Sequence, residues 1–263
     1  MIKLTDDRVE DILKYMEEDI ENCLYLYGDV VRYGIDDPNM TVWYSEVDGN
    51  INTVIMKYFS GCHVYSKNLN YNLDEVVEKL KQIHVNRISS QKEIIEKIYP
   101  LLMGEYEVEY GAVFKLSKFR NMQSPVEIVK AKIEDVPQIA DLLMTNEMYS
   151  SSYKRQDLIE ELSDRISRNI GRSYIMREGE RIIAHDGVTI ETDKFAVEGL
   201  LLLHEDYKDT LYGAFLDSYM VNDLGKEGKT LYAMMLDGRR QDAFVRFGNE
   251  IVARYGKMTF KDL

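Results

Sequence analysis

The chain carries two kinds of apolar pattern, one with helical spacing and one with strand spacing. An apolar stripe from Val9 to Ile20 recurs every three or four residues, which predicts an amphipathic helix. Two segments that favour strands, TVWYSEV and NTVIMKYF, flank Asp48–Gly49, a pair typical of a β-hairpin turn. Helices over 74–83 and 91–102 and an alternating segment over 105–118 follow. The first part of the chain therefore predicts a mixed α/β domain.

The pattern starts again after residues 119–125, FRNMQSP, which break both periodicities. We place the domain boundary there, with domains at 1–120 and 126–263 and a linker at 121–125. The new start is a strand, VEIVKAK, followed by a helix, EDVPQIADLLM. Superposing the two starts matches Lys3 with Lys130, Asp7 with Glu134, Val9 with Val136, Ile12 with Ile139 and Met16 with Leu143.

The two ends also echo each other, because Tyr110–Gly111 precedes VFKLSK and Tyr255–Gly256 precedes KMTFK. Matches at both ends of two similar lengths favour a tandem duplication.

The second half is organised around residues 196–220, AVEGLLLLHEDYKDTLYGAFLDSYM. Four consecutive leucines predict a buried strand over Val197 to Leu203, followed by a polar turn and a helix from Thr210. A strand that leads into a helix N-terminus is a place to hold an anion, because free N–H groups and the helix dipole meet there. The alternative is an ordinary strand–turn–helix connection.

Composition narrows the classes of partner. The 263 residues carry a net charge of −13 with 45% hydrophobic residues, which is typical of a folded soluble protein. Such a charge repels nucleic acid and tolerates a cationic or amine substrate. We find no secretory leader and no apolar run of the roughly 20 residues that span a membrane, so we expect a cytoplasmic protein.

Metal chemistry is not expected from the ligand-forming residues. The four histidines show no metal-ligand spacing, no CxxC occurs, and Cys23 and Cys62 are the only cysteines. We therefore expect no metal and two structural thiols.

The order of elements over 126–263 is a strand, two helices, strands, a central strand, a helix, a strand, a helix and a strand pair. This order resembles the GNAT superfamily of acyl-CoA-dependent N-acetyltransferases, and residues 1–120 look like a more divergent copy. The resemblance implies an α/β fold of two tandem GNAT-like domains, each a central mixed sheet flanked by helices. In such proteins the C-terminal copy is expected to bind acetyl-CoA.

In the family, the central strand leads to an Arg or Gln and then G-x-G-x-G/A, whose amides hold the coenzyme pyrophosphate. Here Lys208 stands in the Arg or Gln position, Asp209 and Leu211 replace two glycines, and Gly213 is retained. At ~4 Å and an effective dielectric constant near 20, Asp209 would repel a phosphate by roughly 4 kcal/mol, a penalty that nearly vanishes if its side chain points outward. The coenzyme contacts that the resemblance implies are Leu201, Leu202, Leu203, Lys208, Asp209, Thr210, Leu211, Tyr212, Gly213, Arg240 and Phe244.

For catalysis, the resemblance gives Glu198 as the base that deprotonates the amine; the alternative is a solvent-facing carboxylate at the strand start. The family's Tyr acid falls on Phe244, which cannot donate a proton, so Tyr232 is the candidate acid, with Tyr255 as the alternative. His185–Asp186 is a weaker candidate, since a single buried His is more often structural.

Two functions follow from the resemblance. The first is direct transfer of an acetyl group to a primary amine of a small molecule or peptide. The alternative is an inactive GNAT-fold protein that serves as a ligand-binding or interaction module. We expect no nucleic acid or membrane partner, and a homodimer stays open.

Overall fold

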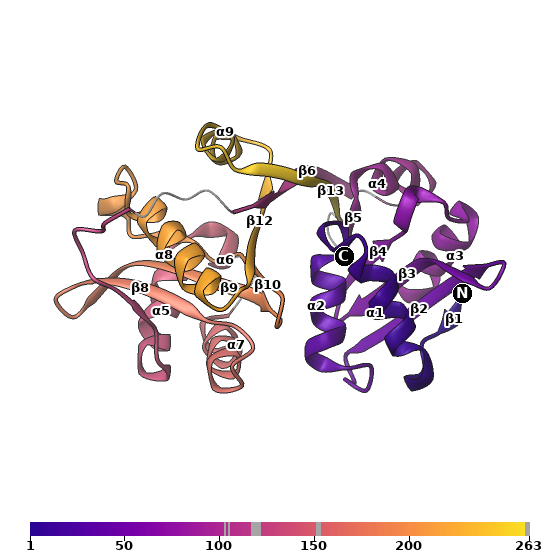
Figure 1. The fold of residues 1–263 in the computed structure, drawn as a ribbon, viewed down its shortest axis with the longest axis horizontal. Helices are drawn as coiled ribbons and strands as arrows, with labels where there is room; N and C mark the ends of the chain where they lie inside the picture. The colour runs from indigo at the N-terminus through magenta and orange to yellow at the C-terminus, as the bar shows by residue number, and fades with distance from the viewer. Residues whose placement is uncertain (103, 105, 117–121, 151–153, 261–263) are drawn as a thin grey trace. The chain divides into compact units, whose positions relative to one another are not determined.

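The computed structural model describes residues 1–102, 104, 106–116, 122–150 and 154–260. The chain forms two compact units (Figure 1). The N-terminal unit contains 1–114, 235–243 and 251–263, and the C-terminal unit contains 115–234 and 244–250. The predicted boundary at 119–125 lies partly outside the described residues.

The N-terminal unit contains a mixed sheet. Its strands, in spatial order, are β1 (Ile2–Lys3), β2 (Met40–Val47), β3 (Asn50–Tyr58), β4 (Gly61–Tyr65), β5 (Arg87–Gln91), β13 (Glu250–Phe260) and β6 (Tyr106–Lys115). The predicted hairpin is confirmed, since β2 and β3 pair antiparallel around Asp48 and Gly49. β4 and β5 pair in parallel, from Gly61 opposite Arg87 to Val64 opposite Ser90.

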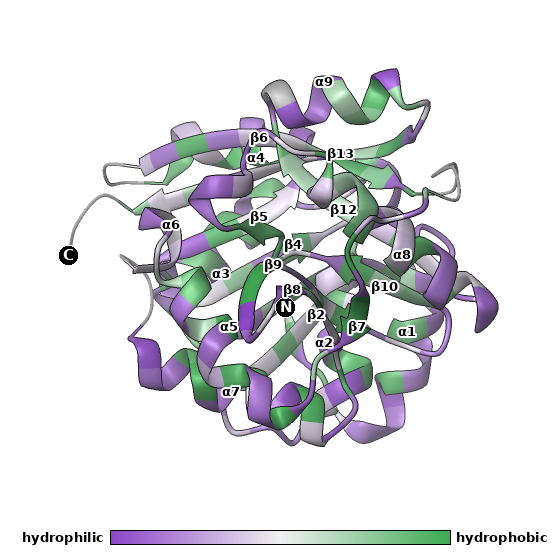
Figure 2. Cartoon of the chain, turned by 90° about the vertical axis from the view of Figure 1, so that its left-hand side faces the viewer, coloured by the Kyte–Doolittle hydropathy of each residue, from purple (hydrophilic) through white to green (hydrophobic). Residues whose placement is uncertain are grey.

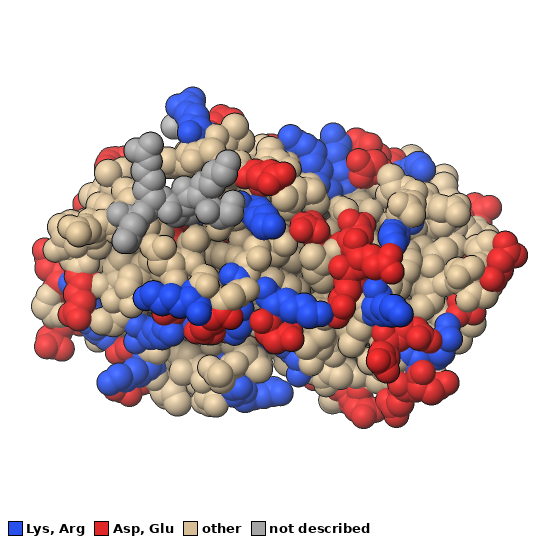
Figure 3. Space-filling model, in the orientation of Figure 1, with Lys and Arg blue, Asp and Glu red and all other residues tan. Residues whose placement is uncertain are grey.

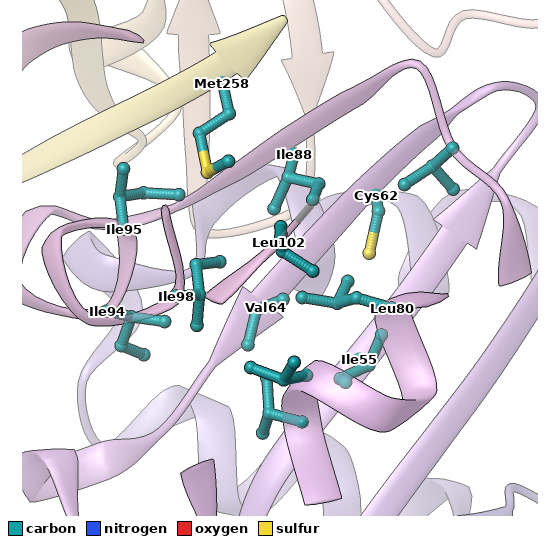
Figure 4. Close-up of a cluster of buried hydrophobic side chains, with 13 residues drawn as sticks. Ile55, Cys62, Val64, Leu80, Ile88, Ile94, Ile95, Ile98, Leu102 and Met258 are labelled. Atoms are coloured by element: carbon teal, nitrogen blue, oxygen red, sulfur yellow. The ribbon is translucent and has the colours of Figure 1, made fainter. Parts of the chain in front are cut away.

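Apolar stripes attach the helices of this unit to its sheet. The helices are α1 (Val9–Glu17), α2 (Leu24–Tyr33), α3 (Leu73–Ile83) and α4 (Lys92–Ile98). The predicted stripes are confirmed, because Ile12 and Met16 of α1 and Val76 and Leu80 of α3 are buried. Figure 4 shows the cluster that α3 and α4 form with the central strands.

The last strand of the chain, β13, lies in the N-terminal unit. It pairs antiparallel with β5, with Tyr255 opposite Gln91, and Met258 is fully buried in the cluster of Figure 4. The sequence predicts domains at 1–120 and 126–263, which would assign this last strand to the second domain.

The two Tyr–Gly pairs lie on neighbouring strands of this sheet, β6 and β13. A Cβ at Gly111 would lie 2.4 Å from the Met235 carbonyl oxygen, and one at Gly256 would lie 2.9 Å from Ile95. Both positions therefore need glycine for close packing.

The C-terminal unit repeats this arrangement. Its strands, in spatial order, are β12 (Thr230–Leu236), β10 (Phe195–Glu198), β9 (Arg181–Glu191), β8 (Ser173–Glu178) and β7 (Ile128–Lys130), and β11 (Leu202–Leu203) also pairs with β9. β10 and β12 pair in parallel, as β4 and β5 do. Each central strand thus has an antiparallel neighbour before it in the chain and a parallel neighbour after it.

Helices cover both faces of the second sheet. They are α5 (Val136–Leu143), α6 (Glu147–Ser150), α7 (Arg155–Ser167) and α8 (Tyr212–Lys226), while α9 (Arg239–Arg246) is divided between the units. An apolar cluster joins α5 and α7 to one face through Ile175 of β8. Tyr174, the residue before it, contacts Tyr219 of α8 on the other face.

The surface carries the amphipathic helices and the acidic side chains that the sequence and its net charge of −13 lead us to expect. In Figure 2, α7 and α9 alternate hydrophilic and hydrophobic residues along their length, the pattern of helices with one buried side. Figure 3 shows acidic side chains gathered in groups over the N-terminal unit on the face drawn there. Among the described residues, no helix combines the length and the apolar character that a membrane crossing requires.

Candidate active site in the C-terminal unit

The central strand of the C-terminal unit is shorter than its leucines predict. β10 ends at Glu198, and the chain returns to the sheet only at Leu202, which pairs with His185 of β9. The prediction of one buried strand from Val197 to Leu203 is therefore wrong, since Leu201 to Leu203 are half-buried. An irregularity in the pairing with β9 falls between Val197 and Glu198, where the strand leaves its regular register.

This early end opens the parallel pair. Glu198 lies opposite Ala233, but β12 continues to Leu236 while β10 has ended. In α/β sheets, ligands bind beyond the carboxyl ends of parallel strands, at the point where neighbouring strands diverge. Glu198 is the last strand residue before that point.

Glu198 lies in a cluster of three buried carboxylates. Asp186 comes from β9, Glu198 from β10 and Asp217 from α8, and they are 0%, 3% and 3% exposed. Their ligand-forming oxygens all lie within 4.8 Å of one another. The predicted alternative of a solvent-facing carboxylate at Glu198 is wrong, because the side chain is buried between the sheet and α8.

The three carboxylates are close enough for their charges to interact strongly. Two unit charges about 5 Å apart repel by roughly 3.5 kcal/mol at an effective dielectric constant of 20. Buried charges at this separation need hydrogen bonds or a positive group to offset their repulsion. A protonated amine is such a group, and the arrangement suits a base that removes its proton.

Sequence reasoning placed Glu198 and noted Asp186, but missed Asp217. The signal is visible in the helix pattern, because Asp217 has helical spacing with the buried residues Met220 and Leu224 of α8. A carboxylate on an apolar stripe is rare unless it is paired or functional.

His185 faces away from the carboxylate cluster. It is the neighbour of Asp186 on β9, and successive strand residues point to opposite faces. Its Nδ1 lies 3.0 Å from the Leu200 carbonyl oxygen. Burial lowers the pKa of His185 from 6.5 to about 4, so the ring is neutral, which agrees with a structural role.

The turn before α8 is on the surface. Lys208, Asp209, Thr210 and Leu211 are exposed, and Lys208 forms an ion pair with Glu205. The Oγ1 of Thr210 accepts a hydrogen bond from the amide of Tyr212, the first residue of α8, at 3.3 Å. Asp209 therefore points to solvent, where its repulsion of a phosphate is screened by water and salt.

Gly213 has a packing role. A Cβ there would lie 3.3 Å from Leu201 and 3.5 Å from Leu203, so the glycine lets α8 approach the leucines that leave the sheet. The first amides of α8 have no acceptor within the helix. The turn thus keeps a helix N-terminus, close backbone packing and one exposed lysine, and these residues fit a pyrophosphate group.

The remaining candidates lie elsewhere. Tyr232 is opposite Val197, and its ring lies 6.0 Å from that of Phe195, so strand alternation puts it on the other face from Glu198. Phe244 is buried, and its carbonyl oxygen accepts a hydrogen bond from the Asn249 amide. Arg240 and Tyr255 belong to the N-terminal unit. Their roles stay predictions.

Solved structures share this arrangement over almost the full chain. A GNAT-family acetyltransferase from Colwellia psychrerythraea is 12% identical with a TM-score of 0.65, and 98% of each chain is covered. A Drosophila protein is 15% identical with a TM-score of 0.70, covering 98% of this chain and 97% of its own. A tandem GNAT protein from the clavulanic acid biosynthesis pathway is 11% identical with a TM-score of 0.62 and the same coverage.

No family model and no curated protein sequence matches the chain. At these identities the likeness concerns the fold. The predicted α/β fold of two tandem GNAT-like domains is confirmed.

Proposed function

We propose that the chain is an acyl-CoA-dependent N-acetyltransferase that transfers an acetyl group to a primary amine of a small molecule or peptide. The observation that carries the proposal is the position of Glu198, at the open end of the parallel pair and in contact range of Asp186 and Asp217. In a GNAT fold this is a place for a base, and the cluster suits a substrate that arrives as a cation.

Each group of residues has its own role in the proposed transfer. Asp186 and Asp217 attract the ammonium group of the acceptor, and Glu198 takes its proton so that the neutral amine can attack. The amides at the start of α8 and Lys208 hold the phosphates of acetyl-CoA, which supplies an activated thioester. Tyr232, the acid expected from the resemblance, lies on the other face of the sheet from Glu198, so the acid for the leaving thiolate is not assigned.

The burial of both cysteines favours direct transfer of the acetyl group from acetyl-CoA to the amine, without an acyl-cysteine intermediate. Cys23 and Cys62 are both buried in the N-terminal unit, and burial raises the pKa of each thiol. A buried thiol with a raised pKa is a poor nucleophile, so no acyl-cysteine step is expected.

The experiment measures CoA release with a panel of primary amines and acetyl-CoA binding by calorimetry. Glu198→Gln should lower the rate by about 10²–10⁴-fold while acetyl-CoA binding is kept, as expected for loss of a base. Tyr232→Phe should be as active as the unchanged chain, and a loss of rate with acetyl-CoA binding kept would restore Tyr232 as the acid.

The alternative is a GNAT-fold ligand-binding module without catalysis. It is favoured by buried Phe244 in the position of the family's acid and by Lys208 already paired with Glu205. Absence of binding at millimolar acetyl-CoA would overturn the enzyme proposal and leave this alternative.

A further inference from the structure

The N-terminal unit has a cavity of its own, of about 520 Å³. This volume lies in the range of roughly 300–1,000 Å³ that small-molecule sites occupy. The cavity is lined by Asp19, Asn22, Asn68, Leu69, Gln91, Glu93 and residues 251–254 of β13. Asn68 follows β4, and Gln91 ends β5, so the cavity lies beyond the carboxyl ends of the parallel pair, a common position for ligands.

The backbone at this cavity is held in an unusual conformation. Asn68 and Leu69 have φ angles of 61° and 56°, in the left-handed region that residues with a Cβ rarely adopt. The loop is anchored just before them, since the Lys67 amide donates to the Tyr15 hydroxyl at 2.7 Å and the Ser66 hydroxyl to the Asn52 carbonyl at 2.7 Å. Such residues gather at ligand sites because the surrounding structure has to impose them.

Gln91 offers a donor to this cavity. Its side chain is 6% exposed, and its Oε1 accepts a hydrogen bond from the Ser66 amide at 3.1 Å, which fixes the orientation of the side-chain amide. Within the described part of the chain, its Nε2 has no hydrogen-bond partner. A carbonyl or carboxylate oxygen of a ligand in the cavity could accept a hydrogen bond from this N–H group.

The charges of the cavity favour a ligand that also carries a cation. Asp19 accepts hydrogen bonds from the Tyr65 hydroxyl at 3.1 Å and from Asn22 at 2.8 Å, and Glu93 adds an exposed carboxylate. The guanidinium of Arg254 already lies 3.8 Å from Asp237, so it balances the carboxylates only in part. A phosphate-bearing coenzyme fits such a lining poorly.

We propose that this cavity binds a free amino acid in its zwitterionic form. The ammonium group lies toward Asp19 and Glu93, and the carboxylate accepts from Gln91 Nε2. The site is separate from the proposed acetyl-transfer site, and its ligand does not have to be the acetyl acceptor.

The test is calorimetric titration of the full chain with glycine, L-lysine, L-glutamate and L-phenylalanine, each alone. At least one should bind with a dissociation constant below about 1 mM, and propylamine and acetate, which each carry one charged group, should bind at least tenfold more weakly. Glu93→Gln should weaken binding severalfold and Gln91→Leu at least tenfold. Glu96→Gln, on the same helix but not in the lining, should change nothing.

Three results would overturn the proposal: none of the four amino acids binds at 10 mM, Glu93→Gln and Gln91→Leu both bind as the unchanged chain does, or propylamine binds as tightly as the amino acids. Glu198→Gln separates this site from the acetyl-transfer site, because it should leave amino acid binding intact. Loss of binding in Glu198→Gln would assign the ligand to the C-terminal unit and refute the proposal as well.

Discussion

The two units differ most where each central strand meets the helix that follows it. In the N-terminal unit this place is apolar, with Ile55 of β3, Val64 of β4 and Val77 of α3 in one buried cluster. In the C-terminal unit the corresponding elements β9, β10 and α8 bring Asp186, Glu198 and Asp217 together. The same contact is therefore apolar in one copy and holds three buried carboxylates in the other.

The largest effect is expected from moving a carboxylate into the apolar copy. Val64→Glu places a charge among buried apolar side chains without a partner, and should lower the free energy of unfolding by about 4 kcal/mol or more. Urea unfolding measures it, with Val64→Ala as the control for lost packing. A cost no larger than that of Val64→Ala would show that the two places are not equivalent.

The next effect depends on pH. His185 has a pKa of about 4 in the folded chain and 6.5 ordinarily, so between these values the unfolded chain binds the extra proton. Stability is therefore full above pH 6.5 and falls as the pH drops toward 4, by up to about 3 kcal/mol. Unfolding from pH 7.5 to 4 should be steeper for the unchanged chain than for His185→Gln; identical slopes would contradict the shift.

The two units also differ in how deeply their ion pairs are buried, and so in what the loss of an ion pair should cost in stability. Arg172 is 14% exposed and bonds Glu191, Asp223 and Glu227, so Arg172→Ala should cost about 2 kcal/mol, because Glu191 is nearly buried. In the N-terminal unit, Glu96 is exposed and lies 3.7 Å from Lys92, so Glu96→Ala should cost about 0.3 kcal/mol. Equal costs in thermal unfolding would contradict the difference in burial.

A smaller effect of opposite sign is expected within the carboxylate cluster. Asp217→Asn removes one charge and nearly conserves the shape, so it should raise the free energy of unfolding by about 1–2 kcal/mol. Exposed Asp193→Asn is the control and should change little. A loss of stability in Asp217→Asn would indicate that the cluster holds a positive group in the resting chain.

Periodicity predicted most of the elements but not every partner. The stripes of α1 and α3 and the hairpin at Asp48–Gly49 follow from local spacing and turn chemistry. The spacing of residues 250–260 favours a strand, but a strand pattern does not specify the sheet that it joins, and β13 pairs with β5.

The candidate site was predictable in part. Glu198 stands out in the sequence because it is a carboxylate in an apolar run. The end of β10 at this residue is not visible in the sequence, because the apolar residues that follow it would also suit a continuing strand. The cavity of the N-terminal unit is lined by Asn68 and Leu69, which both have positive φ angles; Asn favours this conformation, but Leu69 gives no such signal in the sequence.

The position of β13 also has a consequence for synthesis of the chain. The N-terminal unit lacks one of its interior strands until residues 251–260 have left the ribosome, although its other strands are made much earlier. Until then, the edges of β5 and β6 are unpaired and able to join other chains. A nascent chain stalled near residue 240 should therefore be sensitive to protease in its first half, and release of the last segment should bring protection to both halves.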